Sequence, residues 1–352
     1  MVSLPRAGRD ERAIALWLLI CAAMIFVMAA IGGITRLTES GLSITEWQPV
    51  SGVLPPLNEA QWRAAFDAYK QIPQFQAIHA DMTLAQFKGI YFWEYLHRLW
   101  GRLIGFAFLV PFLYFLLARR IPRDLAPKLA GLFVLGGLQG ALGWWMVASG
   151  LESRIEVSQY RLAAHLSAAI IIYLAIVWAA LGLLRPRKPG SAPAELRRGA
   201  AAVLGLALLT LVAGAFVAGL RAGLIDNTFP LMDGHVVPPA WSNLIPWWRN
   251  LFENPEAVQF DHRVLAMATW LAAFALFLVS FRCKTRLSRF AMGAVHGLFG
   301  LVTLQAGLGI ATLLWVVPLP LALAHQLGAT LVVTAALVAR HALGRGTEES
   351  AQ

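Results

Sequence analysis

The chain has 352 residues, of which 58% are hydrophobic and only 14% are charged, and its formal net charge is +10. A soluble domain carries about 25% charged residues, so this chain cannot cover itself with a polar surface, and the composition excludes a soluble globular protein. The basic residues are gathered in short segments between apolar runs, which disfavours a nucleic-acid-binding surface and indicates an integral membrane protein.

Eight apolar runs are long enough to cross a membrane, since a helical span needs about 20 apolar residues. They cover residues 12–32, 97–118, 127–148, 162–184, 199–219, 263–281, 290–314 and 319–340. The first run is too long for a cleaved signal peptide and lacks a small-residue cleavage pattern. We therefore predict an all-α integral membrane protein with eight transmembrane helices.

Basic residues follow the second, fourth and sixth runs, which places these connections in the cytoplasm under the positive-inside rule. The three clusters are Arg119, Arg120, Arg123 and Lys128; Arg185, Arg187, Lys188, Arg197 and Arg198; and Arg282, Lys284, Arg286 and Arg289. Both termini are predicted on the same side because they carry Arg6, Arg9, Arg12, Arg340 and Arg345. The long connections 33–95 and 220–261 then face outward.

The first outer connection contains one recognisable element. Asn58 and Gln61 stand at capping-box spacing, and an apolar stripe follows at Trp62, Ala65, Phe66, Tyr69 and Ile72. We expect an amphipathic helix at the outer interface of the membrane. It either roofs a substrate pocket or serves only as an interfacial anchor.

The second half of the chain repeats the first. The segments EYLHRLWGRL, LQGALGWW and LAAHLSAAII recur as QFDHRVLAMA, LQAGLGIA and LALAHQLGAT, at offsets of 165, 166 and 160 residues. We therefore predict two tandem four-helix bundles, residues 1–190 and 191–352, related by a pseudo-two-fold axis along the membrane normal.

Four of the eight histidines belong to this repeat, with His97 matching His262 and His165 matching His325. Each half thus places one imidazole near the outer end of its second span and one near the outer end of its fourth. A lone histidine on an apolar face is as often a hydrogen-bonded core residue as a ligand. The duplication favours a haem with two histidine ligands in each half, since zinc takes three or four ligands. Small residues of the neighbouring span leave room for a planar group at Gly136, Gly137, Gly140 and Gly143.

Charged residues accompany the second and sixth spans. Arg98, Arg102 and Arg263 lie within about one helical turn of the repeated histidines, where they are candidates for binding haem propionates. The alternative is that they extend to the lipid headgroups. Glu94 precedes His97 by three residues, and the second copy has Gln259 in its place.

The exchange of glutamate for glutamine distinguishes the two halves chemically. An amide cannot act as a base or carry charge, so only the N-terminal half retains a reactive carboxylate. The alternative role for Glu94 is an ion pair with Arg98, one turn further along the helix.

Five motifs occur in order across the spans: GGITRLTESGLSITEWQPVSGVLPPLN, FWEYLHRLWGRLIG, RLAAHLSA, FDHR and AHQLGA. Together they resemble the haem A synthase family, membrane enzymes of cytochrome oxidase maturation that oxidise a ring methyl of haem O to a formyl group. The resemblance implies that His262 and His325 bind a haem b cofactor, that His97 and His165 bind the substrate haem O, and that Glu94 is the catalytic carboxylate. The N-terminal half would then be catalytic.

The resemblance also implies partners and a location. Some family members carry two cysteines in the first outer loop, and residues 33–95 have none, so the chain resembles the proteobacterial and mitochondrial branch. We expect a bacterial inner membrane, haem sites near the periplasmic face, and haem O synthase and an electron acceptor as partners besides lipid. The identity of the acceptor and formation of a homo-oligomer stay open.

Two other functions are compatible with the same histidines. A di-haem b-type electron carrier would not need Glu94, and a haem transporter would place its sites near the membrane midplane. An iron with two histidine ligands has no open position for dioxygen. If the chain is the enzyme, we therefore expect electron withdrawal from the macrocycle, with water as the oxygen source.

Overall fold

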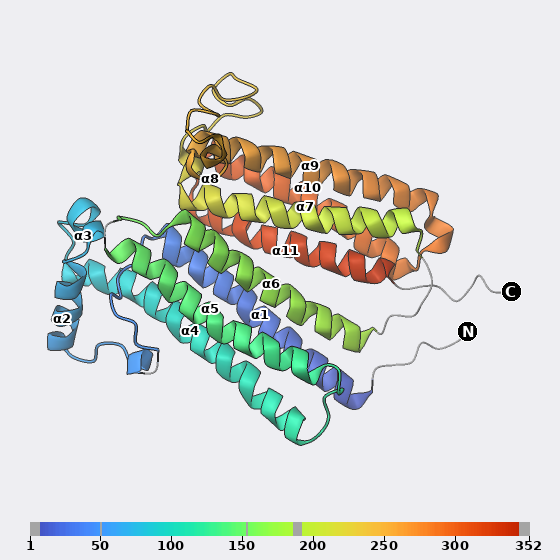
Figure 1. Cartoon of the computed structure of the whole chain (residues 1–352), viewed down its shortest axis with the longest axis horizontal. Helices are drawn as coiled ribbons and strands as arrows, with labels where there is room; N and C mark the ends of the chain where they lie inside the picture. Colours follow the sequence, from blue (N-terminus) through green and yellow to red (C-terminus); the bar gives the residue numbers. More distant parts are fainter. Residues whose placement is uncertain (1–7, 50, 153, 186–191, 345–352) are drawn as a thin grey trace. The chain divides into compact units, whose positions relative to one another are not determined.

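A computed structural model of the chain describes residues 8–49, 51–152, 154–185 and 192–344. Within these ranges eight helices are long and apolar enough to cross a membrane (Figure 1). They are α1 (Arg9–Leu37), α4 (Leu84–Leu117), α5 (Ala126–Leu151), α6 (Gln159–Leu184), α7 (Ala194–Gly219), α9 (Pro255–Arg282), α10 (Arg289–Leu314) and α11 (Leu319–Leu343). The predicted all-α membrane fold with eight spans is confirmed.

Shorter helices lie in the connections. The first outer connection contains η1 (Ser51–Val53), α2 (Glu59–Tyr69) and α3 (Pro73–Ile78), and the second contains η2 (Ala222–Leu224), η3 (Trp247–Arg249) and α8 (Asn250–Glu253). A further turn, η4 (Lys284–Arg286), joins α9 to α10.

Two of the spanning helices begin well before the apolar runs that predict them. α4 begins at Leu84, where Thr83 and Gln86 form a reciprocal capping box. α9 begins at Pro255, where the Asn254 side chain accepts hydrogen bonds from amides of the first turn. These early turns carry polar residues that hydropathy does not detect. The repeated glutamate, glutamine and histidine positions therefore lie inside helices, not at their starts.

The helices group into two compact units, one formed by Cys21–Ile172 and the other by Met1–Ile20 with Tyr173–Gln352. In the second unit α7 packs against α9 and α11, and α10 packs against the same two helices, so these four helices form a bundle. The proposed boundary between halves at residue 190 lies outside the described residues. The pseudo-two-fold relation between halves stays a prediction.

The first unit holds α4, α5 and most of α1 together with the outer helices. α4 contacts α5 and α2. The Trp100 indole of α4 donates to the Met24 carbonyl of α1 at 2.9 Å. α1 and α4 are therefore in direct contact.

α2 forms where the sequence predicts an amphipathic helix. The Asn58 side chain caps it by accepting a hydrogen bond from the Gln61 amide at 2.9 Å. Its apolar stripe is buried, because Phe66 and Tyr69 cluster with Phe87 of α4. The apolar face of α2 thus packs on the protein.

Candidate functional site

The C-terminal histidines face each other across the second unit. His262 of α9 and His325 of α11 have ring centroids 6.4 Å apart and ring planes at 89°. Nδ1 of His262 lies 3.0 Å from the Thr210 carbonyl oxygen, so it donates there as ligand histidines commonly do to a backbone oxygen. The Gln305 amide nitrogen lies 3.0 Å from Nδ1 of His325 and donates to the His325 carbonyl at 2.8 Å. Nδ1 of His262 therefore carries the proton, which leaves the Nε2 lone pair of His262 for a ligand. The Gln305 amide holds the His325 ring and its backbone in place.

The N-terminal histidines, His97 of α4 and His165 of α6, both lie in the first unit. Nδ1 of each ring is buried and has no hydrogen-bond partner within the described residues. Gln139 donates to the His165 carbonyl at 2.6 Å, as Gln305 does to His325. The backbone of the fourth span is thus held alike in both halves, but the imidazoles of the first half are held less firmly.

The histidine pairs fit an iron macrocycle better than a simple metal ion. Among the described residues, no group of three or more His, Cys, Asp or Glu side chains is placed to hold a metal ion, whereas a zinc site needs three or four such ligands. A histidine nitrogen lies about 2 Å from the metal that it binds and about 1 Å from the centre of its own ring. Two imidazoles that bind one metal from opposite sides therefore have ring centres about 6 Å apart. The 6.4 Å between His262 and His325 matches that separation.

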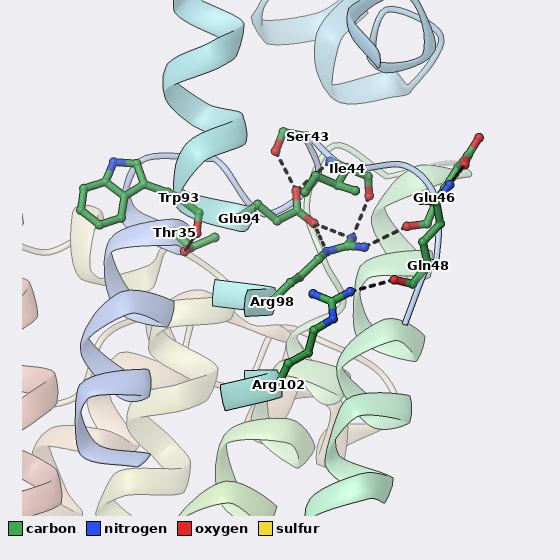
Figure 2. A network of polar contacts seen from close by, with 9 residues as sticks. All are labelled: Thr35, Ser43, Ile44, Glu46, Gln48, Trp93, Glu94, Arg98 and Arg102. Atoms are coloured by element: carbon green, nitrogen blue, oxygen red, sulfur yellow. Dashed lines mark hydrogen bonds and ion pairs between the residues drawn. The ribbon is translucent and has the colours of Figure 1, made fainter. Parts of the chain in front are cut away.

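Glu94 is almost fully buried, with 3% of its surface exposed, and four hydrogen bonds hold its carboxylate (Figure 2). Oε2 accepts from the Ser43 hydroxyl at 2.7 Å and from the Ile44 amide at 2.8 Å. Oε1 accepts from Nη2 of Arg98 at 2.7 Å and from its Nε at 3.2 Å. The ion pair considered from the sequence is therefore present, and the carboxylate is fixed in one orientation.

Arg98 and Arg102 bind the segment that follows α1, as Figure 2 shows. Arg98 donates to the carbonyl oxygens of Ile44 and Glu46, each at 2.8 Å. Arg102 donates to the Gln48 carbonyl at 2.7 Å. The guanidinium groups thus anchor the start of the first outer connection to α4. Their expected contact with propionates stays a prediction.

An aromatic pair anchors the same segment from another helix. Trp47 stacks on Trp144 of α5, with ring centroids 6.0 Å apart and planes at 9°. The Arg98 guanidinium lies 5.6 Å from the centre of the Trp144 ring, within the range of a cation–π contact. The segment is therefore fixed to both α4 and α5.

The C-terminal half repeats this anchor with different chemistry. Arg263 donates to the carbonyls of Asp226 at 2.8 Å and Thr228 at 2.9 Å, two residues apart as in the first half. Gln259 donates to the carbonyls of Ala222 at 2.9 Å and Asp226 at 3.2 Å. The Gln259 amide thus donates hydrogen bonds to backbone carbonyl groups. At the matching position the Glu94 carboxylate accepts hydrogen bonds from a backbone N–H and a hydroxyl.

Several residues of the site are not among those predicted. Gln139 and Gln305 occupy matching positions of the LQGALGWW and LQAGLGIA repeat, which is the signal that would have found them. No sequence signal identifies Thr210, because its backbone carbonyl, and not its side chain, contacts the His262 imidazole.

These features define a multi-pass helical membrane protein with a pair of repeated histidines in each half. A family model described as cytochrome oxidase assembly protein (COX15-CtaA) matches residues 15–337, and the chain belongs to that family.

Relatives named "Heme A synthase" are similar over nearly the whole chain. The protein of Rhodospirillum centenum is 55% identical over 336 residues, which cover 95% of this chain and 88% of the relative. That of Azorhizobium caulinodans is 53% identical, with 95% of each chain covered. That of Nitrosospira multiformis is 49% identical, with 95% of this chain and 94% of the relative covered. The resemblance inferred from the motifs is confirmed.

Proposed function

We propose that this protein is a haem A synthase, an oxidoreductase that converts a ring methyl of haem O to the formyl group of haem A for cytochrome oxidase. Membership of the cytochrome oxidase assembly family and the relatives of that name support the proposal. The structural observation that carries it is the facing pair His262 and His325, whose ring separation of 6.4 Å suits two axial ligands of one iron.

The two histidine pairs have separate tasks in this proposal. His262 and His325 would hold haem b as the resident cofactor, which would supply one-electron transfer. His97 and His165 bind the substrate haem. In support, both second-half imidazoles have a partner at Nδ1, and His262 donates its N–H to a backbone carbonyl, an arrangement that increases ligand basicity and affinity. The first-half Nδ1 atoms have no such partner among the described residues, as suits a ligand that must arrive and leave.

Glu94 acts on the substrate from the helix that carries His97. Oxidation of a methyl to a formyl group with water as the oxygen source releases electrons and protons, so it needs an electron acceptor and a base. Glu94 lies three residues before His97 on α4, on an adjacent part of the helix surface. Its fixed carboxylate can accept a proton or stabilise positive charge that develops on the substrate.

Arg98 and Arg263 remain the proposed propionate contacts. Arg263 retains one donor for this purpose, because its Nε is buried with no hydrogen-bond partner among the described residues. Propionates would extend the anchoring that both guanidiniums already provide to the outer connections, since arginine can bind several oxygen acceptors at once.

The protein is proposed to lie in a bacterial inner membrane with both termini cytoplasmic and the haem sites near the periplasmic face. The support is the basic clusters after the second, fourth and sixth spans. Of the arginines and lysines used for this prediction, Arg6, Arg187, Lys188 and Arg345 lie outside the described residues. Reporter fusions in the three basic connections should be active only as cytoplasmic fusions, and a periplasmic signal after α6 would contradict the orientation.

Mass analysis of haem extracted from the purified protein tests the function. Cells that supply haem O should yield haem carrying a formyl group together with haem b. Haem b alone, with no conversion of added haem O, would contradict the enzyme and support an electron carrier. Unchanged haem O passing across the membrane would instead support a transporter.

A further inference from the structure

Each histidine of the two pairs lies against a glycine of a neighbouring helix. A Cβ atom placed on Gly309 of α10 would lie 2.7 Å from Cε1 of His325. A Cβ atom on Gly143 of α5 would lie 2.9 Å from Cε1 of His165. Carbon atoms do not approach so closely without displacing one another, so both positions exclude any larger residue while the ring keeps its place.

The other two histidines show the same contact. A Cβ atom on Gly214 of α7 would lie 3.1 Å from Cε1 of His262, and one on Gly32 of α1 would lie 3.0 Å from Cε1 of His97. In all four cases the nearest atom is Cε1, the carbon between the two ring nitrogens. Nδ1 follows at 3.4 or 3.5 Å in each case, so the contact lies at Cε1 and its displacement shifts the whole ring, including Nε2.

Backbone conformation does not explain these glycines. All four lie within long helices, where glycine destabilises by roughly 1 kcal/mol relative to alanine. Close helix packing is the usual reason for glycine in a membrane helix, but Gly205 of α7 and Gly307 of α10 have no non-local atom within 4 Å of such a Cβ. Close approach also occurs elsewhere, as between Gly150 and Leu42, but each of the four repeated histidines has such a glycine beside its ring.

We propose that Gly32, Gly143, Gly214 and Gly309 are positioning residues for the four axial imidazoles. The absence of a side chain sets the depth and tilt at which each ring presents Nε2 to the iron. The haem part of this inference rests on the proposed function, whereas the contact between glycine and ring does not.

The rings of the second half have little freedom to escape an added methyl group. His262 is held at Nδ1 by the Thr210 carbonyl, and His325 by Gln305. A methyl group on Gly214 or Gly309 therefore tilts the ring or breaks its Nδ1 contact. Either change weakens the bond from Nε2 to the iron, because ligand orientation and outer hydrogen bonds tune metal affinity.

The first test compares Gly309→Ala with Gly307→Ala, two residues apart on α10, and Gly214→Ala with Gly205→Ala on α7. We measure haem b retained by the purified protein and its low-spin absorption and electron paramagnetic resonance spectra. Gly309→Ala and Gly214→Ala should reduce haem affinity on the order of tenfold or change the low-spin signal, and the matched variants should resemble wild type. Wild-type spectra and affinity in Gly309→Ala and Gly214→Ala would overturn the inference.

The second test needs no haem. In haem-free protein, Gly309→Ala should lower the midpoint of thermal unfolding when His325 is present and should have no such effect in a His325→Ala background, since the clash is then removed. Equal destabilisation in both backgrounds would overturn the positioning role. Loss of the proposed function would appear differently, as wild-type protein that neither binds haem b nor converts haem O while this coupling persists.

Discussion

The two histidine sites share one scaffold and differ in what surrounds it. In both halves, a glutamine binds the carbonyl of the second histidine, a glycine contacts each imidazole, and an arginine binds two carbonyls of the preceding connection. The difference lies at Nδ1 of each ring and at Glu94 against Gln259. The shared residues place the imidazoles alike in both halves. In the proposed function, the changed residues separate retention of the haem b cofactor from reaction of the substrate haem.

The largest expected effect is loss of the cofactor from the second site. His262→Ala or His325→Ala should strip the purified protein of haem b while leaving it inserted in the membrane, because one imidazole cannot replace the pair. Absorption spectra of the reduced protein measure the loss. His235→Ala is the matched control, since His235 is an exposed loop residue outside the repeat. Full retention of a low-spin spectrum in both ligand variants would show that haem b binds elsewhere.

The next effect concerns the Glu94 carboxylate, which the second half replaces with the amide of Gln259. Glu94→Gln gives the first half the amide found at Gln259, and we expect conversion of haem O to fall about a hundredfold or more with haem b retained. Haem O or a hydroxylated intermediate should accumulate on the protein. Mass analysis of extracted haem measures all three species.

Ser43→Ala is the control for the anchoring role of Glu94. It removes one of the hydrogen bonds that Glu94 accepts but keeps the carboxylate, so an anchoring role alone predicts similar losses in both variants. A catalytic role predicts that Ser43→Ala retains most of the activity. Wild-type turnover by Glu94→Gln would reduce the carboxylate to an ion-pair partner of Arg98.

A smaller effect tests the comparison at Nδ1. Gln305→Leu removes the amide contact with the His325 ring and should weaken haem b binding on the order of tenfold. Gln139→Leu removes only a hydrogen bond to the His165 carbonyl and should leave haem b binding unchanged. Titration of haem-depleted protein with haem b measures both affinities. Unchanged haem b affinity in Gln305→Leu would mean that the contact between Gln305 and the His325 ring does not help to hold the ligand.

The sequence predicts the spans and the histidine pairs because both leave a pattern, one of hydropathy and one of repetition. The sequence does not predict contacts in which a side chain binds a backbone atom. The contacts of Arg98 with loop carbonyls and of His262 with the Thr210 carbonyl depend on the path of the chain, which residue types do not encode locally. The early start of α4 is missed for a related reason, since its first turns are stabilised by a polar cap.

The smallest expected effect concerns α2, whose apolar face packs on the first unit through Tyr69. Its hydroxyl lies 2.7 Å from Nδ1 of His79 and 3.0 Å from Gln74 Oε1. Burial, and then the nearby Glu39 and Glu94 carboxylates, raise the pKa of Tyr69 above its usual value. The neutral phenol is thus preferred in the folded protein, so this contribution to stability is complete below about pH 10, the pKa of an unfolded tyrosine, and is lost as the pH rises further.

Tyr69→Phe tests this contribution directly. At neutral pH it should destabilise the protein by about 1 kcal/mol through loss of the hydrogen bonds, and His79→Ala should have a similar effect because it removes one of the same partners. As the pH rises above about 10, the wild-type protein should lose the stability that Tyr69 contributes, whereas the Tyr69→Phe variant has no such contribution to lose. The difference in thermal midpoint between the two proteins should therefore narrow. A constant difference across that range would mean that the phenol does not ionise in either state. Haem b binding should be unchanged in Tyr69→Phe, because α2 belongs to the first unit and the proposed haem b ligands to the second.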